Sequence, residues 1–193
     1  MEAIKIKNKK AFTSAYKIIK MGGVVIYPTD TVYGFLADAA NKNAVKKIFK
    51  IKKRPKSKPL PVFIKDIEMA KKIAFIDKKQ EKILKRYWPG KYTFVLKSKN
   101  ILQTPGVCKN KTIALRIPKY KVLNDLLEKI NKPLVQTSVN ISGQPALTKR
   151  KDILEKFGRT GLPVFLIDAV NLPKSKPSKI VDLTGDNIKI IRK

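Results

Sequence analysis

A short apolar run followed by a hydroxyl-rich loop constrains the fold of this chain more than any other feature. Val24-Val25-Ile26 is typical of a buried strand, and the polar stretch 27–34 comes directly after it. A helical pattern then leads to the cations of 52–54. Because open α/β sheets bind ligands outside the carboxyl ends of their strands, this order predicts a pocket for an anionic small molecule. A simple strand-to-loop turn beside a solvated lysine run is the alternative interpretation.

Strand and helix patterns alternate along the rest of the chain. Apolar residues at helical spacing predict helices over 11–19 and 44–51, the first ended by Gly22-Gly23 and the second capped by Asn43. Asp66 and Asp77 are expected to open two more helices, and others are predicted over 123–130 and 153–157. The predicted strands are 24–26, 60–64, 92–96, 112–117, 134–137, 164–167, 180–183 and 188–191. This alternation favours a single α/β domain over residues 1–193, with a twisted, open, mixed sheet and flanking helices.

The composition excludes several kinds of chemistry. The chain has no histidine and one cysteine, Cys108, so Ser-His and Cys-His nucleophiles, an internal disulfide and a thiolate metal cluster are all ruled out. Neither of the two glycine-rich nucleotide motifs occurs. Any catalysis must therefore use Lys, Arg, hydroxyl groups, carboxylates or the substrate's own groups. Without a long apolar run or a signal-peptide core, the expected protein is cytoplasmic and makes no membrane contact.

The charge is strongly positive. There are 44 Lys and Arg against 14 Asp and Glu, a net charge of +30, which attracts polyanions. The cations are scattered and accompany many Ile and Asn residues, a mixture that AT-rich coding also produces. Contact with nucleic acid and simple base composition therefore both remain open as explanations of the charge.

Two polar segments carry candidate chemistry. Lys52, Arg54 and Lys58 fall at a predicted helix end and in the loop after it, where they can converge on phosphate oxygens. Ser138 and Asn140 follow a predicted strand, so a hydroxyl and an amide can face one ligand. A helix amino-terminal turn is the alternative for that second segment, since Ser and Asn are favoured caps.

Six motifs in a fixed order resemble the YrdC-like threonylcarbamoyl-AMP synthase family, within the YrdC/YciO superfamily. They are Pro28-Thr29-Asp30-Thr31-Val32-Tyr33-Gly34, Lys52-x-Arg54, Trp88-Pro89-Gly90, Leu115-Arg116-Ile117-Pro118, Ser138-x-Asn140-x-Ser142-Gly143 and Pro177-Ser178-Lys179-Ile180-Val181-Asp182. The resemblance implies an open α/β fold with a basic concave cavity. It also implies an enzyme that converts L-threonine, bicarbonate and ATP to threonylcarbamoyl-AMP and pyrophosphate. Downstream enzymes then move the threonylcarbamoyl group to the adenosine beside the anticodon of tRNA.

The same resemblance gives particular residues expected roles. Lys52, Arg54, Ser138 and Asn140 match the family's catalytic tetrad. Thr31, Arg116 and Ser178 match threonine-binding positions, and Arg116 is expected to pair the threonine carboxylate in a bidentate fork. The positions that match ATP-binding residues are Arg54, Lys58, Thr112, Ser138 and Arg192. ATP is expected as a substrate that carries Mg²⁺, with no metal bound by the protein itself.

Two alternatives to the synthase remain. Many family members have His where this chain has Phe63, and Thr where it has Lys179. These departures keep a YciO-like paralogue open, although Ser138-x-Asn140 favours the synthase. The other alternative is a non-catalytic protein that binds tRNA or ribosomal RNA, whose affinity would fall steeply with salt.

Overall fold

The computed structural model contains the α/β architecture that the alternation predicts. It describes residues 1–158, 164–173, 175–185 and 187–192. The strands within these residues are β1 (Glu2–Lys5), β2 (Val24–Tyr27), β3 (Gly34–Asp38), β4 (Val62–Phe63), β5 (Tyr92–Lys97), β6 (Cys108–Lys109), β7 (Thr112–Arg116), β8 (Leu134–Ser138), β9 (Val164–Asp168), β10 (Lys179–Asp182) and β11 (Lys189–Arg192). The helices are α1 (Lys9–Lys20), α2 (Lys42–Lys52), α3 (Ile67–Ile73), α4 (Lys78–Tyr87), α5 (Lys121–Ile130) and α6 (Arg150–Phe157).

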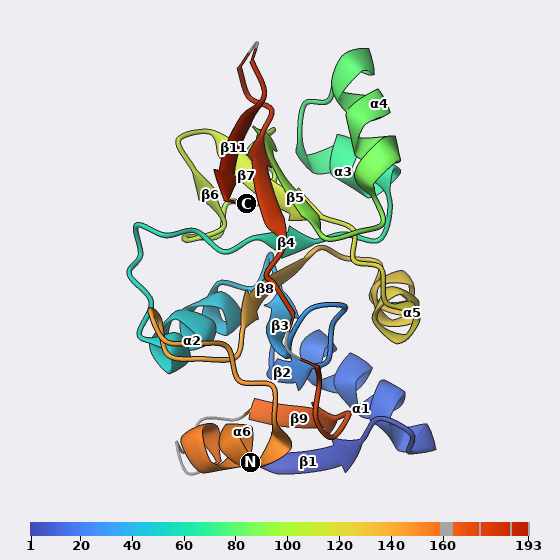
Figure 1. Ribbon diagram of the computed structural model, residues 1–193, viewed down its shortest axis with the longest axis vertical. Helices are drawn as coiled ribbons and strands as arrows, with labels where there is room; N and C mark the ends of the chain where they lie inside the picture. The colour runs from blue at the N-terminus through green and yellow to red at the C-terminus, as the bar shows by residue number, and fades with distance from the viewer. Residues whose placement is uncertain (159–163, 174, 186, 193) are drawn as a thin grey trace.

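All the strands belong to one mixed sheet in the order β1-β9-β2-β3-β8-β4-β7-β5-β10-β11, with β6 paired to β7. Strand β9 is parallel to both of its neighbours, and β3 and β8 are antiparallel. In Figure 1, β8 and the short β4 lie between a lower part, formed by β1, β9, β2 and β3, and an upper part, formed by β7, β5, β10 and β11. The segment that joins β9 to β10 runs from the lower part to the upper one. The predicted open mixed sheet with flanking helices is therefore confirmed.

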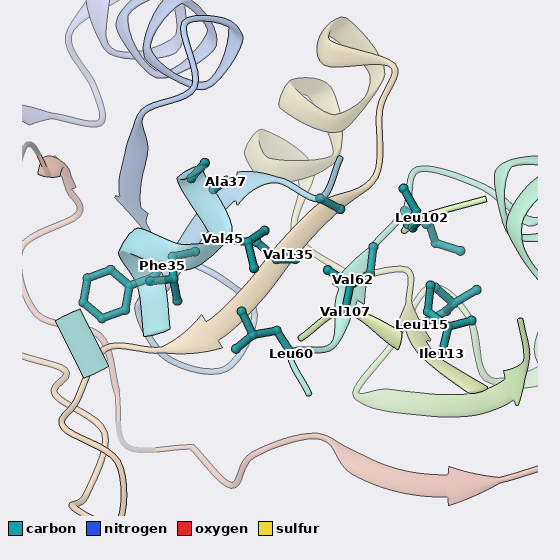
Figure 2. Close-up of a cluster of buried hydrophobic side chains, with 14 of the residues drawn as sticks. Phe35, Ala37, Val45, Leu60, Val62, Leu102, Val107, Ile113, Leu115 and Val135 are labelled. Carbon is teal, nitrogen blue, oxygen red and sulfur yellow. The ribbon is translucent and has the colours of Figure 1, made fainter. Parts of the chain in front are cut away.

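Two hydrophobic clusters hold the helices on the sheet. Helices α1 and α5 pack in the smaller cluster, together with residues of β2, β8 and β9. The larger cluster runs from α2 across the middle of the sheet, where Phe35, Val45, Val62, Leu115 and Val135 lie together (Figure 2). Each fully buried aliphatic side chain of this kind contributes about 1.5–3 kcal/mol. Because α2 is fixed to β3 and β8 in this way, its last residues lie close to the end of β8.

Strand β3 differs most from the sequence-based expectation. The pattern predicts a polar loop followed directly by a helix, but Gly34–Asp38 forms a strand antiparallel to β2. All five of its residues are buried, so the sequence shows no alternation that would indicate a strand. The hydroxyl-rich stretch 28–33 is consequently the connection of a β-hairpin, and not a strand-to-helix loop.

Side chains at the N-cap positions cap the starts of α1 to α4, whereas the N-cap residues of α5 and α6 form no capping side-chain hydrogen bond with the described residues. Asp66 and Asp77 cap α3 and α4 as expected. Helix α2 begins earlier than expected, because Asn41 and not Asn43 provides the cap: the Asn41 side chain accepts from the third backbone N–H of the helix. No helix among the described residues is both long and apolar enough to cross a membrane.

Short strands are the other difference. The expected strand over 60–64 is confined to Val62–Phe63, and Pro61 before it has no N–H to donate to a neighbouring strand. Strands β1 and β6 were not expected from the sequence. Their residues are mostly exposed, so neither carries the apolar run that identifies a buried strand.

Candidate active site

A buried lysine forms the first group of candidate residues. Lys52, the last residue of α2, is 2% exposed. Its Nζ donates to the carbonyl oxygens of Ser138 and Asn140, the second at 3.0 Å, and to the Oδ1 atom of Asn140. The hydroxyl of Ser138 donates to that same Oδ1 at 2.8 Å. Three members of the expected tetrad therefore lie in direct contact, and we call them the lysine cluster.

The local backbone explains why this lysine can be buried. Lys53, directly after α2, has a left-handed conformation that turns the chain away, so Lys52 remains next to the apolar face of the helix. Its carbonyl oxygen accepts from the backbone N–H of Ser142 at 2.8 Å. The Asn140 amide nitrogen donates to the carbonyl of Gln144. These bonds fix the loop after β8 against the end of α2.

Burial gives Lys52 an unusual acidity. It lowers the pKa of Lys52 from 10.5 to about 7, and the nearby positive charge of Arg54 adds to the shift. The three oxygens that accept from the ammonium group favour its charged form and act in the opposite direction. An anion placed beside the ammonium would favour the charged form further. Lys52 can therefore change its charge state near neutral pH when an anion binds.

Arg54, the fourth member of the expected tetrad, is occupied by the loop that follows it. Its Nε donates to the carbonyl of Lys58 at 2.8 Å, and its Nη2 to the carbonyl of Pro59 at 2.9 Å. Burial lowers its pKa. Among the described residues, no hydrogen bond joins its guanidinium to the lysine cluster. Arg54 acts on Lys52 through its charge and stabilises the turn over 54–59.

Lys58 and Thr112 lie near that same turn. The side chain of Lys109 on β6 donates to the carbonyl of Ser57 at 3.0 Å, and the hydroxyl of Thr112 donates to the carbonyl of Lys109 at 2.7 Å. Strand β6 thus ties the start of β7 to the loop that carries Lys58. Within the described part of the chain, no hydrogen bond connects Lys58 or Thr112 to the lysine cluster.

A buried ion pair forms the second group. Arg116, at the end of β7, directs Nη2 to both carboxylate oxygens of Asp30, at 2.8 and 2.7 Å, and Nε to the carbonyl of Gly90 at 2.9 Å. The two side chains are 3% and 7% exposed. Burial lowers the pKa of Arg116, Asp30 opposes that shift, and the charge of Arg192 adds to it. Two of the Arg116 nitrogens that could form the expected bidentate contact with a substrate carboxylate thus already donate to Asp30 and Gly90.

Hydroxyl groups order the loop that carries Asp30. The Thr29 hydroxyl donates to the carbonyl of Val32 at 2.7 Å, accepts from the backbone N–H of Thr31, and lies 3.0 Å from the Thr31 hydroxyl. The phenol of Tyr33 accepts from a backbone N–H and donates to a carbonyl of the segment 169–170. The hairpin connection 28–33 is therefore held from within and from the segment that joins β9 to β10.

Ser178 and Arg192 form the third group. The Ser178 hydroxyl lies 2.9 Å from that of Thr93 on β5. Arg192 on β11 donates to the Ser178 carbonyl through Nε and Nη2, at 2.9 and 2.6 Å. Arg192, expected at an ATP position, thus contacts Ser178, which is expected at a threonine position. The positive charge of Arg192 also lowers the pKa of Arg116, so the second and third groups interact electrostatically.

The hairpin connection joins these groups to the lysine cluster. Gly34, which follows the loop 28–33, pairs with Ser138 in the sheet. The carbonyl of Tyr33 accepts from the backbone N–H of Val139 at 3.0 Å. A cavity of about 400 Å³ borders the cluster on the Asn140 side, with Leu147 among its apolar walls. Its lining combines apolar side chains with polar and charged ones, which include Asp152, Glu155 and Lys156, as the sites of small molecules do.

The two departures from the family pattern occupy different environments. Phe63 is buried, and its ring centroid lies 5.6 Å from the guanidinium carbon of Arg116. Lys179 is exposed, with its ammonium 5.7 Å from the ring of Tyr92. Phe63 therefore supports the buried arginine through its ring face, whereas Lys179 contributes a surface charge.

Sequence reasoning assigned no role to Asp30 or Thr93, although both contact candidate residues. Asp30 had a signal: it is one of only 14 acidic residues and lies in a hydroxyl-rich stretch after a buried strand. Thr93 had none, since its partner is 85 positions away. Among the described residues, no group of three or more His, Cys, Asp or Glu side chains could hold a metal ion.

Comparison with known proteins identifies the family. The Sua5/YciO/YrdC family model, described as telomere recombination, matches residues 17–193, so the chain belongs to this family. A Pyrococcus abyssi protein named threonylcarbamoyl-AMP synthase is 35% identical over 86% of this chain and 48% of its own length. A Methanocaldococcus jannaschii protein named putative threonylcarbamoyl-AMP synthase is 34% identical over 96% of this chain and 86% of its own. The chain thus spans about half of the Pyrococcus relative.

Solved structures give the same fold. The crystal structure of P. abyssi Sua5 complexed with L-threonine matches with a TM-score of 0.88 and 30% identity, over 99% of this chain and 56% of that one. The crystal structure of E. coli YciO matches with a TM-score of 0.84 and 26% identity, over 100% of this chain and 94% of that one. The expected family and fold are therefore confirmed, while the roles of individual residues stay predictions.

Proposed function

We propose that the protein is a threonylcarbamoyl-AMP synthase. It would join L-threonine, bicarbonate and ATP to form threonylcarbamoyl-AMP and pyrophosphate, for modification of the adenosine beside the anticodon of tRNA by downstream enzymes. The main support is the lysine cluster, which combines a buried ammonium, a hydroxyl and an amide in direct contact. Relatives that are named threonylcarbamoyl-AMP synthases support the same activity.

The proposed reaction needs no protein nucleophile. The threonine amine combines with bicarbonate to form a carbamate with loss of water. A carbamate oxygen then attacks the α-phosphorus of ATP, and the bond between the α-phosphorus and the bridging oxygen breaks as pyrophosphate leaves. The protein would align the reactants and stabilise the charge on the phosphates. This suits a chain without histidine.

Each group of residues has a proposed part in this reaction. Lys52, Ser138 and Asn140 would face the reacting phosphate, and the cavity beside Asn140 would hold the adenosine. Arg54 and Arg192 now donate to backbone carbonyls, so contact with ATP would require them to exchange these partners. Lys58 and Thr112 would contact ATP from the other side of the 54–59 turn, completing the proposed basic cavity. ATP would bring Mg²⁺ with it as part of the substrate.

Thr31, Arg116 and Ser178 would hold threonine. Arg116 and Ser178 lie in groups that are connected through Arg192. Thr31 belongs to the loop that carries Asp30, the partner of Arg116. A subsite made of these residues has a buried cation for the carboxylate of the amino acid and hydroxyl groups for its polar side chain.

The test is pyrophosphate release from ATP with bicarbonate, with and without L-threonine, and with L-serine as a control. Release should require threonine and bicarbonate, and Lys52→Ala should lower it about 100- to 1000-fold. Lys46→Ala provides the matched control, because Lys46 is an exposed lysine of the same helix. Circular dichroism would confirm that both variants are folded. Undiminished release in folded Lys52→Ala would contradict the role of the cluster.

A YciO-like paralogue is the second candidate, because the chain covers 94% of E. coli YciO. A folded protein that releases no pyrophosphate with threonine would favour it. Salt-dependent tRNA binding in the absence of any release would instead favour the RNA-binding alternative.

A further inference from the structure

The orientation of Arg116 is set almost completely by two contacts. Its Nε is engaged by the carbonyl of Gly90, and its Nη2 by both oxygens of Asp30. Only Nη1 forms no hydrogen bond with another described residue. A guanidinium held at two of its three nitrogens cannot rotate about its long side chain without breaking buried contacts. It therefore presents one defined nitrogen to a ligand.

Asp30 is itself fixed, so it can fix Arg116 in turn. Its Oδ2 also accepts from the backbone N–H of Lys119 at 3.1 Å. The loop that carries Asp30 is ordered by the Thr29 hydroxyl and by the phenol of Tyr33. The backbone of Lys119 thus supports the carboxylate directly, and the segment 169–170 supports the loop that carries it. An exposed ion pair between two flexible side chains would have no such rigidity.

The charges around Arg116 leave room for one anion. Arg116 and Arg192 are positive and interact with each other, while Asp30 is the negative partner of Arg116. One positive charge in this set stays uncompensated. The carboxylate of a single amino acid would neutralise it, at the nitrogen that Asp30 leaves free.

We propose that Asp30 is a positioning residue for threonine binding: it holds the Arg116 guanidinium so that Nη1 receives the substrate carboxylate. This rests on the proposed function, in which Arg116 binds that carboxylate. Asp30 acts through Arg116 and does not itself contact the reacting atoms. It therefore governs the affinity for threonine and leaves the chemical step and ATP binding nearly unchanged.

The first test is the nearly isosteric variant Asp30→Asn, measured by steady-state pyrophosphate release. A misoriented arginine loses about one charge-assisted hydrogen bond to the substrate, so KM for threonine should rise about 10- to 100-fold. The kcat and the KM for ATP should stay within about twofold. Asp125→Asn is the matched control, because it removes an exposed carboxylate that pairs with Lys121 on the same helix.

The second test separates positioning from stability. Asp30→Asn leaves a buried guanidinium without its charge partner, and the variant can fail to fold for that reason. The double variant Asp30→Asn/Arg116→Met removes both buried charges and avoids this problem. Its KM for threonine should equal that of Arg116→Met within about twofold, because Asp30 acts only through Arg116.

The outcomes are distinguishable. Folded Asp30→Asn with unchanged KM for threonine would overturn the positioning role while leaving the synthase intact. A double variant whose KM rises well beyond that of Arg116→Met would also overturn it, since Asp30 would then act independently. A wild-type chain that shows no threonine-dependent release would overturn the proposed function and the positioning role together.

Discussion

Binding of ATP should be accompanied by uptake of a proton at Lys52. With its pKa at about 7, the side chain of the free protein is about half protonated at pH 7 and about one-tenth protonated at pH 8. A phosphate group beside Nζ stabilises the ammonium and returns its pKa toward 10.5. Binding should therefore take up about 0.5 proton at pH 7 and about 0.9 proton at pH 8. Each further pH unit should weaken ATP binding about tenfold until Lys52 reaches its bound-state pKa.

Isothermal titration calorimetry provides the assay. ATP binding is measured at each pH in buffers with different ionisation enthalpies, and the slope of the observed enthalpy gives the number of protons taken up. Lys52→Met removes the titrating group with little change in side-chain length, and Lys46→Met is the control on the exposed face of the same helix. Both variants also correct for protonation of ATP itself. Equal proton uptake in wild type and Lys52→Met at pH 8 would refute the reasoning.

Three further predictions concern the stability of the ligand-free protein. Below about pH 7 Lys52 is charged in both states, and the folded state is destabilised by burying its ammonium group. Between about pH 7 and 10.5 the folded state loses this proton, whereas the unfolded state keeps it. The urea midpoint of the wild-type protein should therefore rise over this pH range, and that of Lys52→Met should rise less. An equal rise in the two proteins would contradict the lowered pKa of Lys52. Asp77→Ala removes a reciprocal capping box and should cost about 1 kcal/mol in urea unfolding, whereas an unchanged midpoint would show that the cap contributes nothing. Tyr33→Phe should cost about 1–3 kcal/mol, because backbone groups of 169–170 lose their partner. Tyr16→Phe, whose hydroxyl bonds to no described residue, should cost less than about 0.5 kcal/mol, and equal losses would argue against the Tyr33 contact.

Local signals account for the parts of the fold that sequence reasoning predicted. Asp66 and Asp77 mark helix starts because a cap depends on residues within one turn. Strand β3 was missed because both of its faces are buried, and the short apolar run 35–37 shows no alternation, so it can indicate a strand or a helix. The cap of α2 was misplaced because two asparagines, 41 and 43, both precede its apolar face.

The candidate site depends on contacts that no local pattern encodes. Lys52 meets Asn140 across 88 positions, and Asp30 meets Arg116 across 86. The first pair could be anticipated from the family motifs alone. The second could not, because a carboxylate in a polar loop is as compatible with solvent as with a buried arginine. Only the folded structure shows that Arg116 already has a carboxylate partner.

The position of β9 affects how the chain can fold while it is being synthesised. Strand β9 lies between β1 and β2 and is hydrogen-bonded to both, so Glu2 pairs with Phe165. A nascent chain that still lacks residues 164–168 therefore exposes two unpaired strand edges from its first synthesised segment. Such edges pair readily with other chains, and pairings between distant residues form slowly. The pairing of β1 and β2 with β9 can therefore form only once the last fifth of the chain is being made, even though the helices can form early.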